Sequence, residues 1–177
     1  VPPSFAPPLS MNQSAFVRQI YEATSAQYAA YEETAYHVYF CRRILAAALR
    51  RTPPEVVYDI GCGSGVLTSS LACEFPKVQF EGIDFCASLV CRARQRIQLP
   101  NLTFTVADFA TDGPELIRDA VAKHRHILIL VSGALEYYGP TDLLSLRLRE
   151  FWRAAPSGGL ISLFHNAEAL GRRWFSH

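Results

Sequence analysis

Glycines and carboxylates stand together at the ends of short apolar runs in the middle of this 177-residue chain. Residues 61–65 read G-C-G-S-G, a turn with so few side-chain atoms that a ligand can lie directly against the backbone. Asp59 precedes these glycines, and Asp84 and Asp108 follow the next two apolar runs. One carboxylate can accept two hydrogen bonds from a ribose diol, and another can accept from the amino edge of a base. The pattern predicts a site for a nucleoside whose polar tail lies over the glycines.

The spacing of the glycines distinguishes between kinds of nucleoside cofactor. A phosphate-binding loop needs Lys and then Ser or Thr after its last glycine, and this chain has Val66 and Leu67 there. A dinucleotide fingerprint reads G-x-G-x-x-G, whereas residues 61–65 read G-x-G-x-G. The carboxylate of Asp59 would repel a pyrophosphate but would attract an ammonium or sulfonium group. A cationic amino-acid tail is therefore favoured over a nicotinamide cofactor, and a tight turn without a ligand is the remaining alternative.

Short apolar runs alternate with amphipathic segments along most of the chain, and these elements must position the site. We expect strands at residues 56–60, 78–83, 102–106, 126–131 and 160–164. We expect helices at residues 66–75, 87–98, from about 114 to 123, and 141–154. Such alternation implies parallel strands with helices on both faces, and ligands then bind beyond the carboxyl ends of the strands. The predicted fold is a doubly wound α/β sheet.

Three parts of the chain differ in composition. Residues 1–13 are proline-rich and read as an extended arm or linker. Residues 14–52 have a helical pattern, and residues 53–177 carry the strand–helix alternation. We expect 14–52 to form helices that act as a lid over cofactor and acceptor. Helix packing is the alternative role for their tyrosines, which are Tyr21, Tyr28, Tyr31, Tyr36 and Tyr39.

Composition and charge exclude several classes of partner. With 17 basic and 16 acidic residues the net charge is +1, so we expect no nucleic acid partner. No apolar run reaches the roughly 20 residues of a membrane helix, so we expect no membrane partner. The five cysteines form no C-x-x-C pair, which predicts no zinc or other metal site and free, mostly buried thiols in a reducing, cytoplasmic setting.

The sequence resembles the class I S-adenosylmethionine-dependent methyltransferases of small-molecule type. The segments that carry this resemblance are residues 57–65, 81–84, 106–109, 131–137 and 156–160. The resemblance implies a Rossmann-like, mainly parallel sheet, methyl transfer from S-adenosylmethionine, and S-adenosylhomocysteine as the product. Sheets of this family have seven strands, so the chain would hold about five and lack the last two.

The resemblance also implies which residues bind the cofactor. They are Asp59, Gly61, Cys62, Gly63, Gly65, Asp84, Phe85, Asp108, Phe109 and Tyr28. Asp84 would bind the ribose hydroxyls, and Asp108 would accept from the adenine amino group. Phe85 would pack on the adenine, and Asp59 would lie near the ammonium group.

The sequence specifies the residues around the methyl acceptor less fully than those around the cofactor, because in-line methyl transfer depends mainly on positioning and water exclusion. Candidate catalytic residues are His165, Glu136 and Tyr137. His165 suits a base or an acceptor-orienting group because imidazole titrates near neutral pH, although it would equally well cap a helix. For Glu136, anchoring of its loop is the alternative. Residues 132–135 read S-G-A-L and lack the segment typical of adenine or glutamine methylation, so we expect a small, partly apolar acceptor methylated on oxygen, nitrogen or carbon.

Two further expectations concern the whole molecule. The alternative function is a methyltransferase-like domain that acts as a non-catalytic binding or regulatory partner. After the fifth expected strand at 160–164 and the adjoining His165, only residues 166–177 remain. This length predicts either that the chain is a fragment or that the edge of its fifth strand is exposed. We expect a partner chain or a second copy, in a homo-oligomer, to cover such an edge.

Overall fold

A computed structural model describes residues 13–34, 36–134 and 142–163 of the chain. Its helices are α1 (Gln13–Thr34), α2 (Tyr36–Arg51), α3 (Val66–Glu74), α4 (Ala87–Arg96), α5 (Phe109–Lys123) and α6 (Leu143–Ala154). Its strands are β1 (Val56–Ile60), β2 (Gln79–Asp84), β3 (Leu102–Val106), β4 (His126–Ser132) and β5 (Ser157–Leu163).

The five strands form one parallel sheet in the order β3-β2-β1-β4-β5. Both β2 and β4 pair with β1, so the chain leaves β1 in one direction and later returns to build the sheet in the other. This reversal is the switch point at which α/β sheets bind ligands. The doubly wound fold with about five strands is confirmed.

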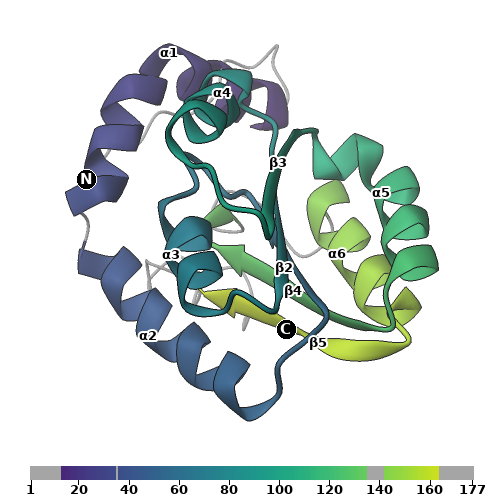
Figure 1. Cartoon of the computed structure of the whole chain (residues 1–177). Helices are drawn as coiled ribbons and strands as arrows, with labels where there is room; N and C mark the ends of the chain where they lie inside the picture. Colours follow the sequence, from purple (N-terminus) through teal and green to yellow (C-terminus); the bar gives the residue numbers. More distant parts are fainter. Residues whose placement is uncertain (1–12, 35, 135–141, 164–177) are drawn as a thin grey trace, which may run out of the picture.

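Strand β1 is buried on both faces because helices cover both (Figure 1). Val56, Tyr58 and Ile60 pack in the apolar cluster beneath α5 and α6. Val57 packs in the opposite cluster with residues of α2 and α3. Alternate side chains of a strand point to opposite faces, so a five-residue apolar run serves both layers. The run of β1 thereby fixes the position of the residues that follow it.

Most predicted strands agree closely with the structure, and the fifth is displaced. The predicted strand at 160–164 instead begins at Ser157, which pairs with His126 at the start of β4. Gly158 and Gly159 pair with Ile127 and Leu128 of β4. Both glycines therefore belong to the strand, which starts three residues earlier than predicted.

The predicted start of the fifth helix near Pro114 is wrong, because α5 begins at Phe109. Asp108 caps it by accepting a hydrogen bond from the Ala110 N–H at 3.0 Å. Pro114 lies inside the helix and lacks the N–H that would reach the carbonyl of Ala110. Arg147 of α6 donates to that carbonyl through Nε at 3.3 Å, so the proline is tolerated.

Strands β3 and β5 are the outermost strands of the sheet that the structure describes. Within the described residues, no helix combines the length and the apolar character needed to cross a membrane. All five cysteines are free, three of them buried. In the same described ranges, no three His, Cys, Asp or Glu side chains group in a way that could hold a metal ion.

Candidate functional site

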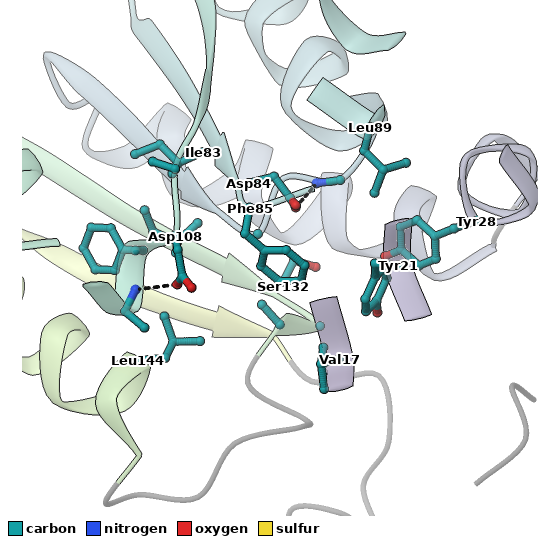
Figure 2. Close-up of a pocket in the computed structure, with 18 residues that line it drawn as sticks. Val17, Tyr21, Tyr28, Ile83, Asp84, Phe85, Leu89, Asp108, Ser132 and Leu144 are labelled. Atoms are coloured by element: carbon teal, nitrogen blue, oxygen red, sulfur yellow. Dashed lines mark hydrogen bonds between the residues drawn. The ribbon is translucent and has the colours of Figure 1, made fainter. Parts of the chain in front are cut away.

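A pocket opens at the carboxyl ends of β1, β2, β3 and β4, beneath α1. Seven of the predicted cofactor residues line it: Tyr28, Gly61, Gly63, Asp84, Phe85, Asp108 and Phe109. Figure 2 shows Asp84 and Asp108 reaching the pocket from neighbouring strand ends, with the Phe85 ring beside them.

Asp84 organises the glycine turn, which we call the glycine loop (residues 61–65). Its Oδ2 accepts the Gly63 N–H at 2.9 Å and its Oδ1 accepts the Cys86 N–H at 2.8 Å. The carboxylate is buried, and burial raises its pKa above the ordinary value although both backbone donors act in the opposite direction. Each carboxylate oxygen keeps a lone pair for a ligand.

At two positions of this loop only glycine fits, because φ is positive and a neighbouring side chain lies where a Cβ would be. Gly61 has a φ of 80°, and a Cβ there would lie 2.6 Å from the Ala134 Cβ. Gly63 has a φ of 57° and lies against the carboxylate of Glu32. Gly65 does not line the pocket: a Cβ there would strike the Phe104 ring at 2.5 Å, so this glycine serves helix–sheet packing.

Asp59 and Cys62 lie behind the pocket rather than in its lining. The Asp59 carboxylate is almost fully buried and accepts a hydrogen bond from Thr68 Oγ1 at 2.5 Å. Burial raises the pKa of Asp59 to about 7, and the nearby charge of Asp84 adds to the effect. Cys62 packs with Val90 and other apolar residues. Direct contact of Asp59 with an ammonium group stays a prediction.

Glu32 of α1 is a residue at the site that the sequence did not indicate. Its Oε2 accepts hydrogen bonds from the Ser64 N–H at 2.9 Å and from Ser64 Oγ at 2.6 Å. Burial raises the pKa of Glu32 to about 7, and repulsion from Asp84 and Asp59 contributes. No local motif marks this glutamate, because its role depends on how α1 lies against a loop about thirty residues later in the chain.

The other end of the pocket carries Asp108, which is only half-buried. Its Oδ2 accepts a hydrogen bond from the Arg18 guanidinium at 2.6 Å, and its Oδ1 caps α5. The same guanidinium lies 5.3 Å from the centre of the Phe85 ring. Arg18 therefore contacts both residues that the resemblance assigns to the adenine, and the sequence did not indicate it either.

The N-terminal helix covers the pocket with aromatic side chains. Tyr21 lies edge-on to Tyr28 at 5.0 Å between ring centres, and to Phe85 at 6.0 Å. Glu22 fixes the helix to the start of α4 by accepting the Ala87 N–H at 2.9 Å. Tyr31, by contrast, is exposed.

The three predicted catalytic residues, His165, Glu136 and Tyr137, lie outside the described residues. Ala134, the last described residue before Glu136 and Tyr137, lines the pocket. Their catalytic roles stay predictions.

Comparison with known families identifies this arrangement. The model of a methyltransferase domain family matches residues 57–159, more than half of the chain. The chain belongs to this family of methyltransferase domains. S-adenosylmethionine is the methyl donor that the family uses, so the predicted fold, enzyme class and cofactor are confirmed at this level.

The residues of this methyltransferase domain fit such a donor. Gly63 has no side chain, so a ligand in the pocket can lie directly against its backbone. Among the described residues, the buried carboxylates of Asp59 and Asp84 and the half-buried carboxylate of Glu32 have only uncharged hydrogen-bond donors as direct partners. A ligand with positive charge complements them.

Curated relatives of the methyltransferase domain are themselves named as methyltransferases. Trans-aconitate 2-methyltransferase of Methylobacterium radiotolerans is 35% identical over 121 residues, which are 67% of this chain and 42% of that protein. Malonyl-[acyl-carrier protein] O-methyltransferase 2 of Coxiella burnetii is 32% identical over 73 residues, 41% of this chain and 29% of that protein. The chain thus spans less than half the length of either relative.

Solved structures show the same fold. Human N-acetylserotonin methyltransferase, in complex with S-adenosylmethionine, aligns with a TM-score of 0.64 at 18% identity, covering 86% of this chain and 41% of that one. The N-methyltransferase NodS of Bradyrhizobium japonicum, in complex with S-adenosylhomocysteine, aligns with a TM-score of 0.59 at 18% identity, covering 82% and 71%.

Proposed function

We propose that this domain transfers the methyl group of S-adenosylmethionine to a small, partly apolar acceptor. The observation that carries the proposal is the single pocket into which the ends of β1, β2 and β3 bring Gly63, Asp84 and Asp108. S-adenosylmethionine supplies a methyl group activated by its sulfonium charge. The protein's part is then to hold donor and acceptor in line and to exclude water.

Each described residue has a distinct part in holding the donor. Asp84 has lone pairs left for the ribose diol after accepting its two backbone N–H groups. Phe85 offers an aromatic face beside Asp108, which accepts from the adenine amino group. Helix α1 acts as the lid, with Tyr28 and Tyr21 over the pocket. Helix α2, which we also expected in the lid, contributes no lining residue and packs against α3 and the sheet.

Apolar side chains in the same pocket favour an acceptor with an apolar part. Val17, Ala134 and Leu144 line it, and none of its described lining residues is Lys or Arg. Oxygen, nitrogen and carbon acceptors all remain compatible with in-line transfer. We propose His165 as the base or acceptor-orienting group, with Glu136 and Tyr137 beside the acceptor.

The outer edge of the described sheet is a candidate surface for binding a partner chain. Strand β5 is outermost in the described sheet, and a parallel strand edge invites pairing. We propose that a partner chain or a second copy of this chain covers it.

Calorimetric titration with S-adenosylmethionine, S-adenosylhomocysteine and NAD tests the proposal. We expect micromolar binding of the first two ligands and none of NAD, whose pyrophosphate would meet the carboxylates of the glycine loop. Mass spectrometry of reactions with trans-aconitate, other small carboxylic acids and aromatic alcohols or amines then identifies the acceptor. Tight binding of NAD alone would contradict the proposal, and binding of the donor without a methylated product would favour the non-catalytic alternative.

A further inference from the structure

The glycine loop is held between two carboxylates that come from different parts of the fold. From β2, Asp84 accepts the N–H of Gly63 at 2.9 Å. From α1, Glu32 accepts the N–H and the hydroxyl of Ser64, the next residue. Glu32 lies so close to the loop that a Cβ on Gly63 would be 2.5 Å from its Oε1. Because Gly63 lines the pocket, Glu32 touches the backbone against which a ligand would lie.

Among the residues that the structure describes, no ion pair balances the negative charge at this end of the pocket. Glu32 faces Asp59 of β1, Asp84 of β2 and the buried thiol of Cys62 in the loop. None of the ion pairs between described residues includes Glu32, Asp59 or Asp84. The charge of Arg18 reaches Asp84 only as the last of the influences on its pKa. A buried carboxylate without a counter-charge is stabilised by a cationic ligand.

We propose that Glu32 is a positioning residue that distinguishes S-adenosylmethionine from S-adenosylhomocysteine by charge. The inference rests on the proposed function. Methyl transfer converts the sulfonium of the donor to a neutral thioether, so donor and product differ by one positive charge at nearly equal shape. With the donor present, Glu32 is held as the carboxylate, which strengthens its hydrogen bonds to Ser64. Helix α1 is then hydrogen-bonded more strongly to the glycine loop before methyl transfer than after it. The weaker contact after transfer favours release of the product.

The charge of the bound ligand also alters the protonation of the carboxylates near it. In the ligand-free protein the pKa values of Glu32 and Asp59 are each about 7, so both are partly protonated near neutral pH. Binding of a cation lowers these pKa values: the carboxyl O–H bond breaks and the proton passes to the buffer. Affinity for S-adenosylmethionine therefore rises as the pH increases through about 7 and levels off above it. The affinity for S-adenosylhomocysteine rises less over the same pH range.

The test compares Glu32→Gln with Glu33→Gln, its neighbour on the same helix. Glu33 pairs with Arg96 on the exposed side of α1 and does not touch the loop. Calorimetry gives the affinity ratio of S-adenosylmethionine to S-adenosylhomocysteine at about pH 8. We expect the ratio to fall about tenfold in Glu32→Gln, the equivalent of one unit of pKa, and to stay unchanged in Glu33→Gln. Ser64→Ala removes one of the two hydrogen bonds that Glu32 accepts from the loop, so we expect the ratio to fall by less than in Glu32→Gln.

A measurement on the unaltered protein gives an independent answer if Glu32→Gln does not fold. Titrations in buffers of different ionisation enthalpy count the protons released on binding at about pH 7. We expect S-adenosylmethionine to release more protons than S-adenosylhomocysteine. Equal release, or an unchanged affinity ratio in folded Glu32→Gln, would overturn the inference alone. Failure of the unaltered protein to bind either ligand would overturn the proposed function.

Discussion

The two ends of the pocket hold their carboxylates in opposite ways. Asp84 follows directly from β2, is buried, and bonds only to backbone N–H groups. Asp108 comes two residues after β3, is half-buried, and pairs with Arg18 while it caps α5. The motifs around them look alike in sequence, yet one carboxylate organises a loop and the other joins two helices.

The difference explains how a nucleoside with a charged tail would be oriented. At the glycine loop, the carboxylates of Glu32, Asp59 and Asp84 have no cationic partner among the described residues, so this end attracts positive charge. At the other end, Arg18 already neutralises Asp108. That end therefore suits an uncharged base edge, which needs an acceptor rather than a counter-ion.

The largest expected effect comes from removing each carboxylate in turn. Asp84→Ala loses acceptors for the Gly63 and Cys86 N–H groups, and hydrogen bonds to charged groups contribute about 1.5–3 kcal/mol each. We expect about a hundredfold loss of affinity for S-adenosylhomocysteine by calorimetry, against about tenfold or less for Asp108→Ala. Thermal melts check that both variants fold. Equal losses would show that the two ends do not differ in the way described.

Much of the fold follows from local pattern. The strands at 56–60 and 102–106 agree with the sequence prediction because an apolar run bounded by turn residues leaves little choice. The start of α5 does not, because Pro114 resembles a helix start whereas Asp108 supplies the cap and Arg147 satisfies the freed carbonyl. That compensation comes from another helix and has no local signal.

The residues of the site likewise fall into those that the sequence predicts and those that it does not. Residues at strand ends, such as Asp84 and Phe85, were found because their motif and the topology place them together. Glu32 and Arg18 were missed because both come from α1, and only the packing of that helix brings them to the pocket. In sequence they are ordinary charged residues of a polar helix.

The next effect concerns the pH dependence of stability in the ligand-free protein. The pKa values of Glu32 and Asp59 are raised by burial from about 4 in the unfolded chain to about 7 in the fold. Between these values the folded state binds more protons, so raising the pH removes stability. We expect the free energy of unfolding to fall by about 1.4 kcal/mol or more from about pH 5 to about pH 8, since one unit of pKa corresponds to that amount.

Urea unfolding at the two pH values measures this change. The double variant Glu32→Gln with Asp59→Asn should flatten it, whereas Glu33→Gln on the exposed side of α1 should not. If the free energy of unfolding instead rose from about pH 5 to about pH 8, the carboxylates at the glycine-loop end of the pocket would have to be neutralised by a counter-charge. That end would then no longer differ from the Asp108 end.

The smallest effect is the coupling between Arg18 and Asp108. A double-mutant cycle with Arg18→Gln and Asp108→Asn isolates it, and exposed ion pairs contribute about 0.2–1 kcal/mol. Screening by salt should reduce the coupling further, because Arg18 is largely open to solvent. Asp108→Asn on its own also weakens the cap of α5, an effect that the cycle subtracts. If the coupling exceeded about 2 kcal/mol and resisted salt, the Asp108 end would be as shielded as the loop end. The pocket would then have two buried ionic ends rather than one, and a neutral base edge would no longer be the better fit beside Asp108.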